Sequence, residues 1–185
     1  MTVYIDTGVF IDYLIYRSLS GKLPRKVQRR RRSMSRLAKD VDSCLSKIKR
    51  NNYQALTSTL TLFEIENVMF QNITHYFKKG IAYKDSHVVI SARIAINQGI
   101  ATANTYNIKF LDLNNAIVHQ MISSIVLQLK SIQSADSLHI ITAIQNNAEI
   151  FISTDKHMTD LDNTIQNTNG KLIRFVDTDE ALNIL

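Results

Sequence analysis

The sequence contains very few of the residues that interrupt or cross-link a chain. Its 185 residues include one proline, one cysteine, five glycines and no tryptophan. A single cysteine excludes a disulfide framework and a cysteine-rich metal site. No run of ~20 apolar residues is present, as a membrane-spanning helix would need, and no signal-peptide pattern is seen. We therefore expect a cytoplasmic protein that has no membrane partner.

The length and composition favour one globular domain over residues 1–185. The chain is 45% hydrophobic and 21% charged, and a chain of this length can bury one large core but not two. No glycine-rich phosphate loop follows an apolar run, which disfavours a nucleotide-binding fold. The small number of glycines therefore argues against functions that depend on such a nucleotide-binding loop.

Positive charge is concentrated in one segment. Of the 22 Lys and Arg residues, 12 lie between Lys22 and Arg50 with only two acidic residues, and the rest of the chain has 10 basic and 14 acidic residues. Such an asymmetry favours a polyanionic partner, here RNA phosphates and with less support DNA, although a solvated helix face is the simpler alternative. No aromatic residue is interleaved, so contact would give affinity without base stacking. The candidate nucleic-acid-binding residues are Arg25, Lys26, Arg29, Arg30, Arg31 and Arg32.

Short apolar runs alternate with helical periodicities along the chain. We expect strands at residues 3–5, 55–58, 108–113, 149–152 and 172–176, and helices at 8–17, 33–51, 59–77, 84–103, 114–130 and 134–147. This alternation predicts an α/β fold of three layers (α/β/α) with a central parallel sheet of about five strands. The basic segment would be a helical insert at about residues 18–52.

Three of these helices carry more specific expectations. The helix at 59–77 is apolar nearly all round, which predicts a central position in the fold. The helix at 114–130 is predicted to be continuous, with Ile117, Met121, Ile125 and Val126 on one side. Asp12 is predicted to lie on the outer face of the first helix.

Four acidic residues are predicted to lie at one edge of the sheet. Asp6 ends the first strand, and Asp155 follows the fourth directly. Glu64 lies in the first turn of the helix after the second strand, and Asp136 in the first turn of the helix from Ser134. The carboxyl ends of parallel strands share an edge, where active sites collect. Taken singly, each acid has an ordinary explanation. Glu64 can form a capping box with Thr61, and the aspartates can cap helices or favour the positive end of a helix dipole.

Four converging carboxylates would repel one another unless a cation lay between them. Ligand sets made of oxygen suit Mg²⁺ or Mn²⁺, which keep part of their water shell and bind phosphate oxygens. Such ions activate water and stabilise the leaving oxygen of a phosphodiester. Together with the basic segment, the four acids indicate metal-dependent phosphodiester hydrolysis.

The segments that carry these acids resemble the PIN-domain ribonucleases, including the VapC-type toxins of toxin–antitoxin pairs. They are IDTGVFIDYL with Asp6, STLTLFEI with Glu64, SADSLHIITA with Asp136 and FISTDKHM with Asp155, in the family's order. The resemblance implies a PIN-like fold, an endoribonuclease activity dependent on Mg²⁺ or Mn²⁺, and a metal site formed by these four catalytic acids. By the same resemblance, Thr7 and Ser153 would support the acids, and an antitoxin protein and a second copy of the chain would be candidate partners. The long basic stretch departs from compact toxins.

Two other functions are weighed against the ribonuclease. A PIN-like RNA-binding module of an RNA-processing or regulatory assembly, with weak or no nuclease activity, would explain the basic segment alone. A phosphatase with Asp6 as an aspartyl nucleophile fits poorly, because Gly8 stands where a second acid is needed. His139 is predicted to be a core residue, and His157 a surface residue that can reach substrate.

Overall fold

The computed structural model describes residues 1–19, 34–77 and 85–185, and in this part of the chain five strands form one parallel sheet. The strands are β1 (Thr2–Ile5), β2 (Gln54–Ser58), β3 (Ile108–Leu111), β4 (Ile150–Ile152) and β5 (Arg174–Val176), in the order β3-β2-β1-β4-β5. Every neighbouring pair is parallel. The prediction of a parallel α/β fold with about five strands is confirmed.

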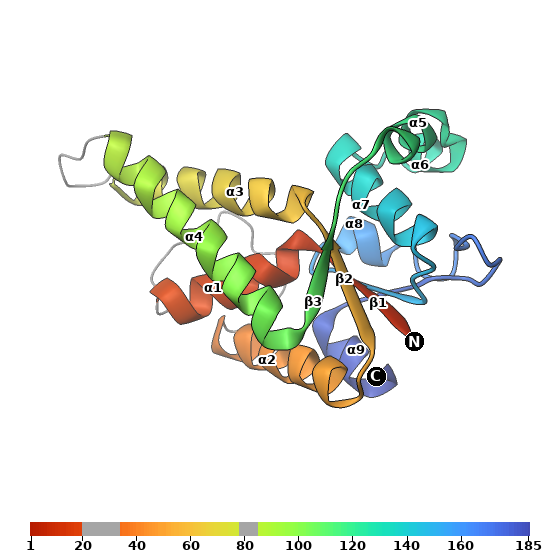
Figure 1. The fold of residues 1–185 in the computed structure, drawn as a ribbon, viewed down its shortest axis with the longest axis horizontal. Helices are drawn as coiled ribbons and strands as arrows, with labels where there is room; N and C mark the ends of the chain where they lie inside the picture. The colour runs from red at the N-terminus through yellow and green to blue at the C-terminus, as the bar shows by residue number, and fades with distance from the viewer. Residues whose placement is uncertain (20–33, 78–84) are drawn as a thin grey trace.

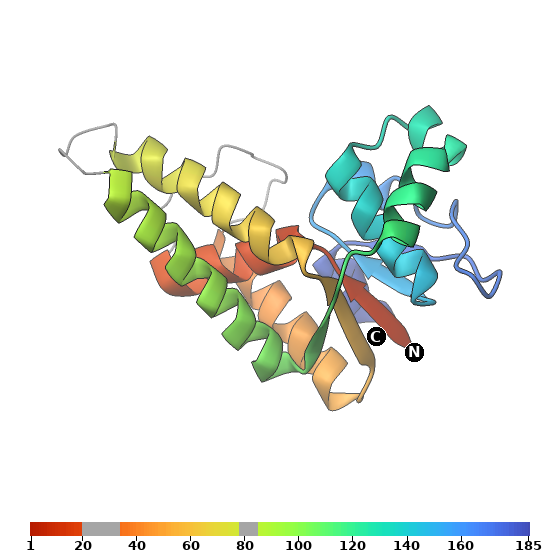
Figure 2. The same cartoon turned by 45° about the horizontal axis from the view of Figure 1, so that its top comes forward.

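Helices cover both faces of the sheet (Figures 1 and 2). On one side lie α1 (Thr7–Leu19), α2 (Met34–Arg50), α3 (Leu60–Phe77), α4 (Asp85–Tyr106) and α9 (Thr178–Ile184). On the other lie α5 (Asn115–Ser123), α6 (Ile125–Leu129), α7 (Ser134–Gln145) and α8 (Lys156–Thr159). The two cores follow from strand alternation: Val3 and Ile5 belong to the first, and Tyr4 to the second.

Aromatic rings on neighbouring strands stabilise the second core. Tyr4 is paired with Phe151, and Phe151 with Phe175, in the sheet register. Their ring centroids are 5.1 Å apart for Tyr4 and Phe151 and 4.9 Å apart for Phe151 and Phe175. All three side chains are buried, so this row fixes the register of β1, β4 and β5 beneath α7.

The prediction that the helix at 59–77 is central is wrong. Helix α3 packs against α4 and α1 along one side, and the α3–α4 hairpin extends beyond the sheet (Figure 1). Ile65 and Met69 are buried on that side, whereas Phe63 is 68% exposed and Phe70 39% exposed. An apolar residue on every side of a helix therefore did not indicate burial on every side.

The single helix predicted at 114–130 is instead two helices, α5 and α6. Ser124 between them has an extended backbone (ψ 94°), and its N–H donates to the carbonyl oxygen of Met121. The side-chain amide of Gln128 donates to the carbonyl oxygen of Ile122 at 2.7 Å, which satisfies a group freed by the break. Because of this change of direction, Ile125 and Val126 are exposed and Leu127 is buried.

Two short helices, α8 and α9, lie outside the predicted helix ranges. The prediction that Asp12 lies on the outer face of the first helix is wrong. Asp155 caps α8 and Asp177 caps α9 through their side chains. Asp12 is buried because α1 is surrounded by α2, α3 and α4. No helix in the described ranges has the length and apolar character to cross a membrane.

The predicted basic insert is described only in part. Its described residues include the end of α1 and the whole of α2, which packs against α1 and α9. All six candidate nucleic-acid-binding residues, from Arg25 to Arg32, lie outside the described residues.

The one-sided packing of α3 can be tested with two substitutions in that helix. We expect Ile65→Ala to reduce the free energy of unfolding by about 2–5 kcal/mol, because it leaves a cavity in the core. Phe63→Ala should change it by less than about 0.5 kcal/mol, since the ring is mostly in water. Urea denaturation of the two variants measures both values, and equal losses would contradict the exposed position of Phe63.

Candidate active site

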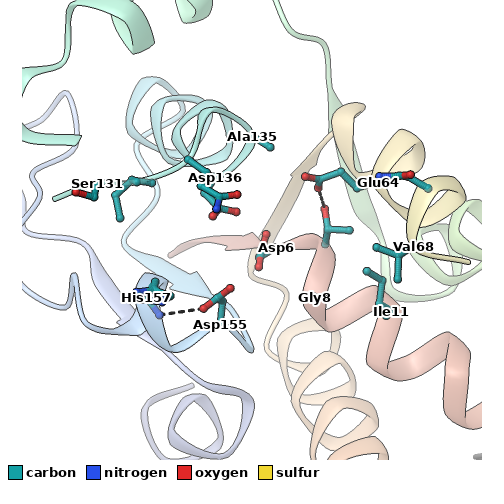
Figure 3. Close-up of a pocket in the computed structure, with 14 residues that line it drawn as sticks. Asp6, Gly8, Ile11, Glu64, Val68, Ser131, Ala135, Asp136, Asp155 and His157 are labelled. Carbon is teal, nitrogen blue, oxygen red and sulfur yellow. Dashed lines mark hydrogen bonds between the residues drawn. The ribbon is translucent and has the colours of Figure 1, made fainter. Parts of the chain in front are cut away.

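The four predicted acids lie around one pocket with a volume of about 560 Å³. In Figure 3, Asp136 and Glu64 lie on opposite sides of the opening with Asp6 between them, and Asp155 lies next to Asp6. The other lining residues are Thr7, Gly8, Ile11, Asn67, Val68, Ser131, Ile132, Gln133, Ala135 and His157. Four segments far apart in the sequence therefore contribute one carboxylate each.

The sheet topology places the pocket where the strand order changes direction. From β1 the sheet continues through β2 to β3 on one side and through β4 to β5 on the other. Asp6 follows β1 directly, and its N–H donates to the carbonyl oxygen of Ile152 at the end of β4. In open α/β sheets such a switch point forms a crevice at the carboxyl ends of the strands, and the pocket lies there.

Asp6 is held by Ser153. The Ser153 hydroxyl donates to Oδ2 of Asp6 at 2.6 Å, and the Ser153 hydroxyl oxygen accepts the N–H of Asp155 at 3.0 Å. Burial raises the pKa of Asp6 above its ordinary value, and the charge of Glu64 acts in the same direction, against the charge of His139 and the Ser153 hydrogen bond. Ser153 thus links two of the four acids.

Glu64 is held from the opposite side. Its Oε2 accepts hydrogen bonds from the Thr7 hydroxyl and from Nε2 of His139, the latter at 2.8 Å. Burial raises the pKa of Glu64, but the hydrogen bond and charge of His139 and the hydrogen bond of Thr7 outweigh burial, so the pKa is below its ordinary value. Glu64 remains ionised.

The capping-box explanation of Glu64 is wrong. The Ser58 hydroxyl, and not Thr61, accepts the first free N–H of α3, that of Leu60. The Thr61 hydroxyl lies 2.8 Å from the Thr57 hydroxyl in the interior. The carboxylate of Glu64 turns towards Thr7 and the pocket, so capping does not account for it.

The pKa of Asp136 reflects the proximity of the other acids. Burial, followed by the charges of Asp6, Asp155 and Glu64, raises the pKa of Asp136 to about 6. Asp155 has two roles, because it lines the pocket and its Oδ1 also accepts the N–H of His157 as the cap of α8. The capping explanation is therefore correct for Asp155 but does not remove it from the pocket.

His139 is a site residue that the sequence analysis assigned to the core. It is buried, as predicted, but both ring nitrogens have polar partners: Nε2 contacts Glu64, and Nδ1 lies 2.8 Å from the Tyr4 hydroxyl. Its spacing of three from Asp136 places both on one side of α7, and this was the available signal. Asn67 and Gln133 also line the pocket, and no sequence pattern distinguished them.

The chemistry of the pocket suits a hard divalent cation. Its donors are carboxylate oxygens, and burial together with the charges of Asp6, Asp155 and Glu64 raises the pKa of Asp136. Within the described residues, no three His, Cys, Asp or Glu side chains are close enough to hold an ion together. Mg²⁺ is commonly bound by one or two carboxylates and several waters, so a closed cage is not required.

Comparison with family models, with curated proteins and with solved structures found no match for this chain. The function must therefore be argued from the pocket and from the four sequence segments that form it.

The cost of burying Asp136 beside the other acids can be tested through stability. Because the pKa of Asp136 is about 6 in the folded protein, against 3.8 ordinarily, its carboxylate destabilises the metal-free fold above pH 6, and protonation relieves this as the pH falls towards 4. Asp136→Asn should therefore stabilise the protein at pH 7.5 by ~1 kcal/mol, after allowance for solvent screening, or about 2–4 °C in Tm. The gain should shrink at pH 4.

Thermal unfolding in EDTA at the two pH values measures this effect. Asp112→Asn is the control, because Asp112 also follows a strand but is exposed and does not line the pocket. A loss of stability in Asp136→Asn at pH 7.5, or a gain equal at both pH values, would contradict a charge at Asp136 made costly by burial and by the neighbouring acids.

Proposed function

We propose that this chain is a metal-dependent endoribonuclease that hydrolyses RNA phosphodiester bonds with Mg²⁺ or Mn²⁺. The observation that carries the proposal is the pocket itself, where Asp6, Glu64, Asp136 and Asp155 meet from four separate segments. Capping explains Asp155 and contributes to the position of Asp6, which precedes α1 and accepts the backbone N–H of Thr7, but both acids still line the pocket. Carboxylates that are buried or partly buried beside one another are costly to maintain, and such clusters are typical of functional sites.

The charge of the pocket supports a cation as part of the site. None of the described residues that line it is Lys or Arg. A phosphodiester would be repelled by the four acids unless positive charge were supplied between them. A divalent ion offsets the negative charge of the carboxylates and that of the phosphate. One cation can therefore stabilise the pocket and allow the substrate to bind.

The residues of the chain orient the acids for this task. Ser153 donates a hydrogen bond to Oδ2 of Asp6, while Thr7 and His139 donate hydrogen bonds to Oε2 of Glu64. The second oxygen of each carboxylate can therefore face a ligand in the pocket. A bound Mg²⁺ or Mn²⁺ supplies positive charge that activates water and stabilises the transition state at phosphorus. In the hydrolysis, the water oxygen bonds to phosphorus, one ester P–O bond breaks, and the leaving oxygen takes a proton.

The resemblance to PIN-domain ribonucleases supports RNA over DNA as the substrate. It also supports the more specific proposal that the chain is the toxin of a toxin–antitoxin pair, with an antitoxin protein as its partner. The basic segment, from Arg25 to Arg32, would hold the RNA backbone by its phosphates, with affinity that falls as salt rises. The exposed His157, next to the pocket, is a candidate for substrate contact.

The proposal is tested by cleavage of labelled single-stranded RNA, structured RNA and DNA with Mg²⁺, with Mn²⁺ or with EDTA. We expect cleavage of RNA that requires the metal, and a loss of at least about 100-fold in Asp6→Asn and Asp136→Asn, because each removes one charge from the site. Asp112→Asn should keep full activity.

Three other outcomes would each change the conclusion in a different way. Cleavage that survives both substitutions would show that the activity comes from another site or a contaminant. RNA binding that is sensitive to salt, without cleavage, would favour the RNA-binding module. Preferential cleavage of DNA would keep the chemistry and change the substrate.

A further inference from the structure

A continuous set of hydrogen bonds runs from the core of the sheet to the acidic pocket. The Tyr4 hydroxyl contacts Nδ1 of His139 at 2.8 Å, and Nε2 of His139 contacts Oε2 of Glu64 at 2.8 Å. The Thr7 hydroxyl donates to the same carboxylate oxygen and lies 3.2 Å from Nε2. Tyr4 and His139 are both buried, so neither can touch a substrate in the pocket.

The partners of His139 fix which way its ring faces. The Glu64 carboxylate can only accept, so Nε2 must carry a hydrogen and donate to it. The Tyr4 hydroxyl can donate or accept, and it therefore satisfies Nδ1 whether or not that atom is protonated. Both ring nitrogens are bound, so a rotation of the ring would break the hydrogen bonds of Nδ1 and Nε2. Leaving these buried atoms without partners is unfavourable. The ring is therefore held in one orientation, and Oε2 of Glu64 with it.

Tyr4 is itself held rigidly. Its ring stacks on Phe151 with an interplanar angle of 18° and meets the His139 ring edge-on, with centroids 5.9 Å apart. A phenylalanine would fill the same place in this row of rings. The hydroxyl is thus not needed to fill the core, and its role lies in its hydrogen bonds, which join Ser58 and His139.

We propose that Tyr4 and His139 are positioning residues that set the affinity of the acidic pocket for a divalent cation. They do so by holding Oε2 of Glu64 away from the pocket centre, which directs Oε1 towards the bound ion. This inference rests on the proposed function, because it requires that the pocket bind a cation. Residues that orient metal ligands through hydrogen bonds are typically worth 10–100-fold in metal affinity.

The alternative is that the network serves stability alone, and conservative substitutions separate the two. In His139→Gln the amide nitrogen lies about where Nε2 lies, so the bond to Glu64 is kept. In His139→Asn the shorter amide reaches only the position of Nδ1, so the bond to Glu64 is lost. Tyr4→Phe removes only the hydroxyl. A purely structural role would give affinities that do not follow the bond to Glu64.

The experiment is a titration of the full chain with Mn²⁺ alone, followed by calorimetry and by electron paramagnetic resonance of the free ion, with Tm recorded for each variant. We expect His139→Asn to bind Mn²⁺ 10–100-fold more weakly than the wild type and His139→Gln to stay within about threefold of it. Tyr4→Phe should weaken binding severalfold in the wild type and have no effect in His139→Gln, because the coupling runs through Nδ1.

Tyr13→Phe is the matched control. Tyr13 is also buried, and its hydroxyl is 3.3 Å from that of Tyr106 in the other core. It should leave Mn²⁺ affinity unchanged even if Tm falls. Equal affinities for His139→Gln and His139→Asn, or the same Tyr4→Phe effect in both backgrounds, would overturn the positioning role while leaving the proposed function intact. A wild type that binds no Mn²⁺ would overturn both.

Discussion

Mutual repulsion between four carboxylates is the constraint on which the arrangement of this protein depends. Asp6 is buried, and burial of Asp136 together with the charges of Asp6, Asp155 and Glu64 raises the pKa of Asp136 to about 6. Without a cation, the negative charges of Asp136 and Asp6 work against folding, because the pKa of each is raised in the folded protein. The surrounding structure must therefore supply enough packing and hydrogen bonding to hold the acids together. The two cores on either side of the sheet provide it, and the acids lie where these cores meet the carboxyl edge.

The two halves of the pocket are held by different means. On the side of β4, Ser153 connects Asp6 to the backbone of Asp155. On the side of α3, Thr7 and His139 bind one oxygen of Glu64. The close approach at Gly8 joins the halves, since a Cβ there would lie 2.5 Å from Oγ1 of Thr154. A larger residue at this position would require the Thr154 side chain or α1 to shift.

The sequence predicted the features that depend on local pattern and on strand ends. The five strands, the sheet class and the acids at the strand ends follow from alternation of apolar runs and from the geometry of parallel sheets. The exposure of Phe63 and the break at Ser124 could not be predicted, because both depend on which helices pack beside them. Asp12 likewise has a helical period that indicates an outer face, and only the packing of α2, α3 and α4 around α1 buries it. His139 was predicted to be buried, but its contact with Glu64 joins segments 75 residues apart.

Strand periodicity explains why the packing of the core determines the positions of the pocket residues. Side chains two apart on a strand point to the same face, so Tyr4 and Asp6 share a face, as do Phe151 and Ser153. The backbone continues the ladder past the strand ends, because Asp6 N–H donates to Ile152 and Ser153 N–H donates to Val176. The rings of Tyr4 and Phe151 stack in register, and the same register brings the Ser153 hydroxyl to Asp6. A slip of one residue in β1 would turn both Tyr4 and Asp6 to the other face, so the aromatic row that stabilises the sheet also determines the alignment of the acidic site.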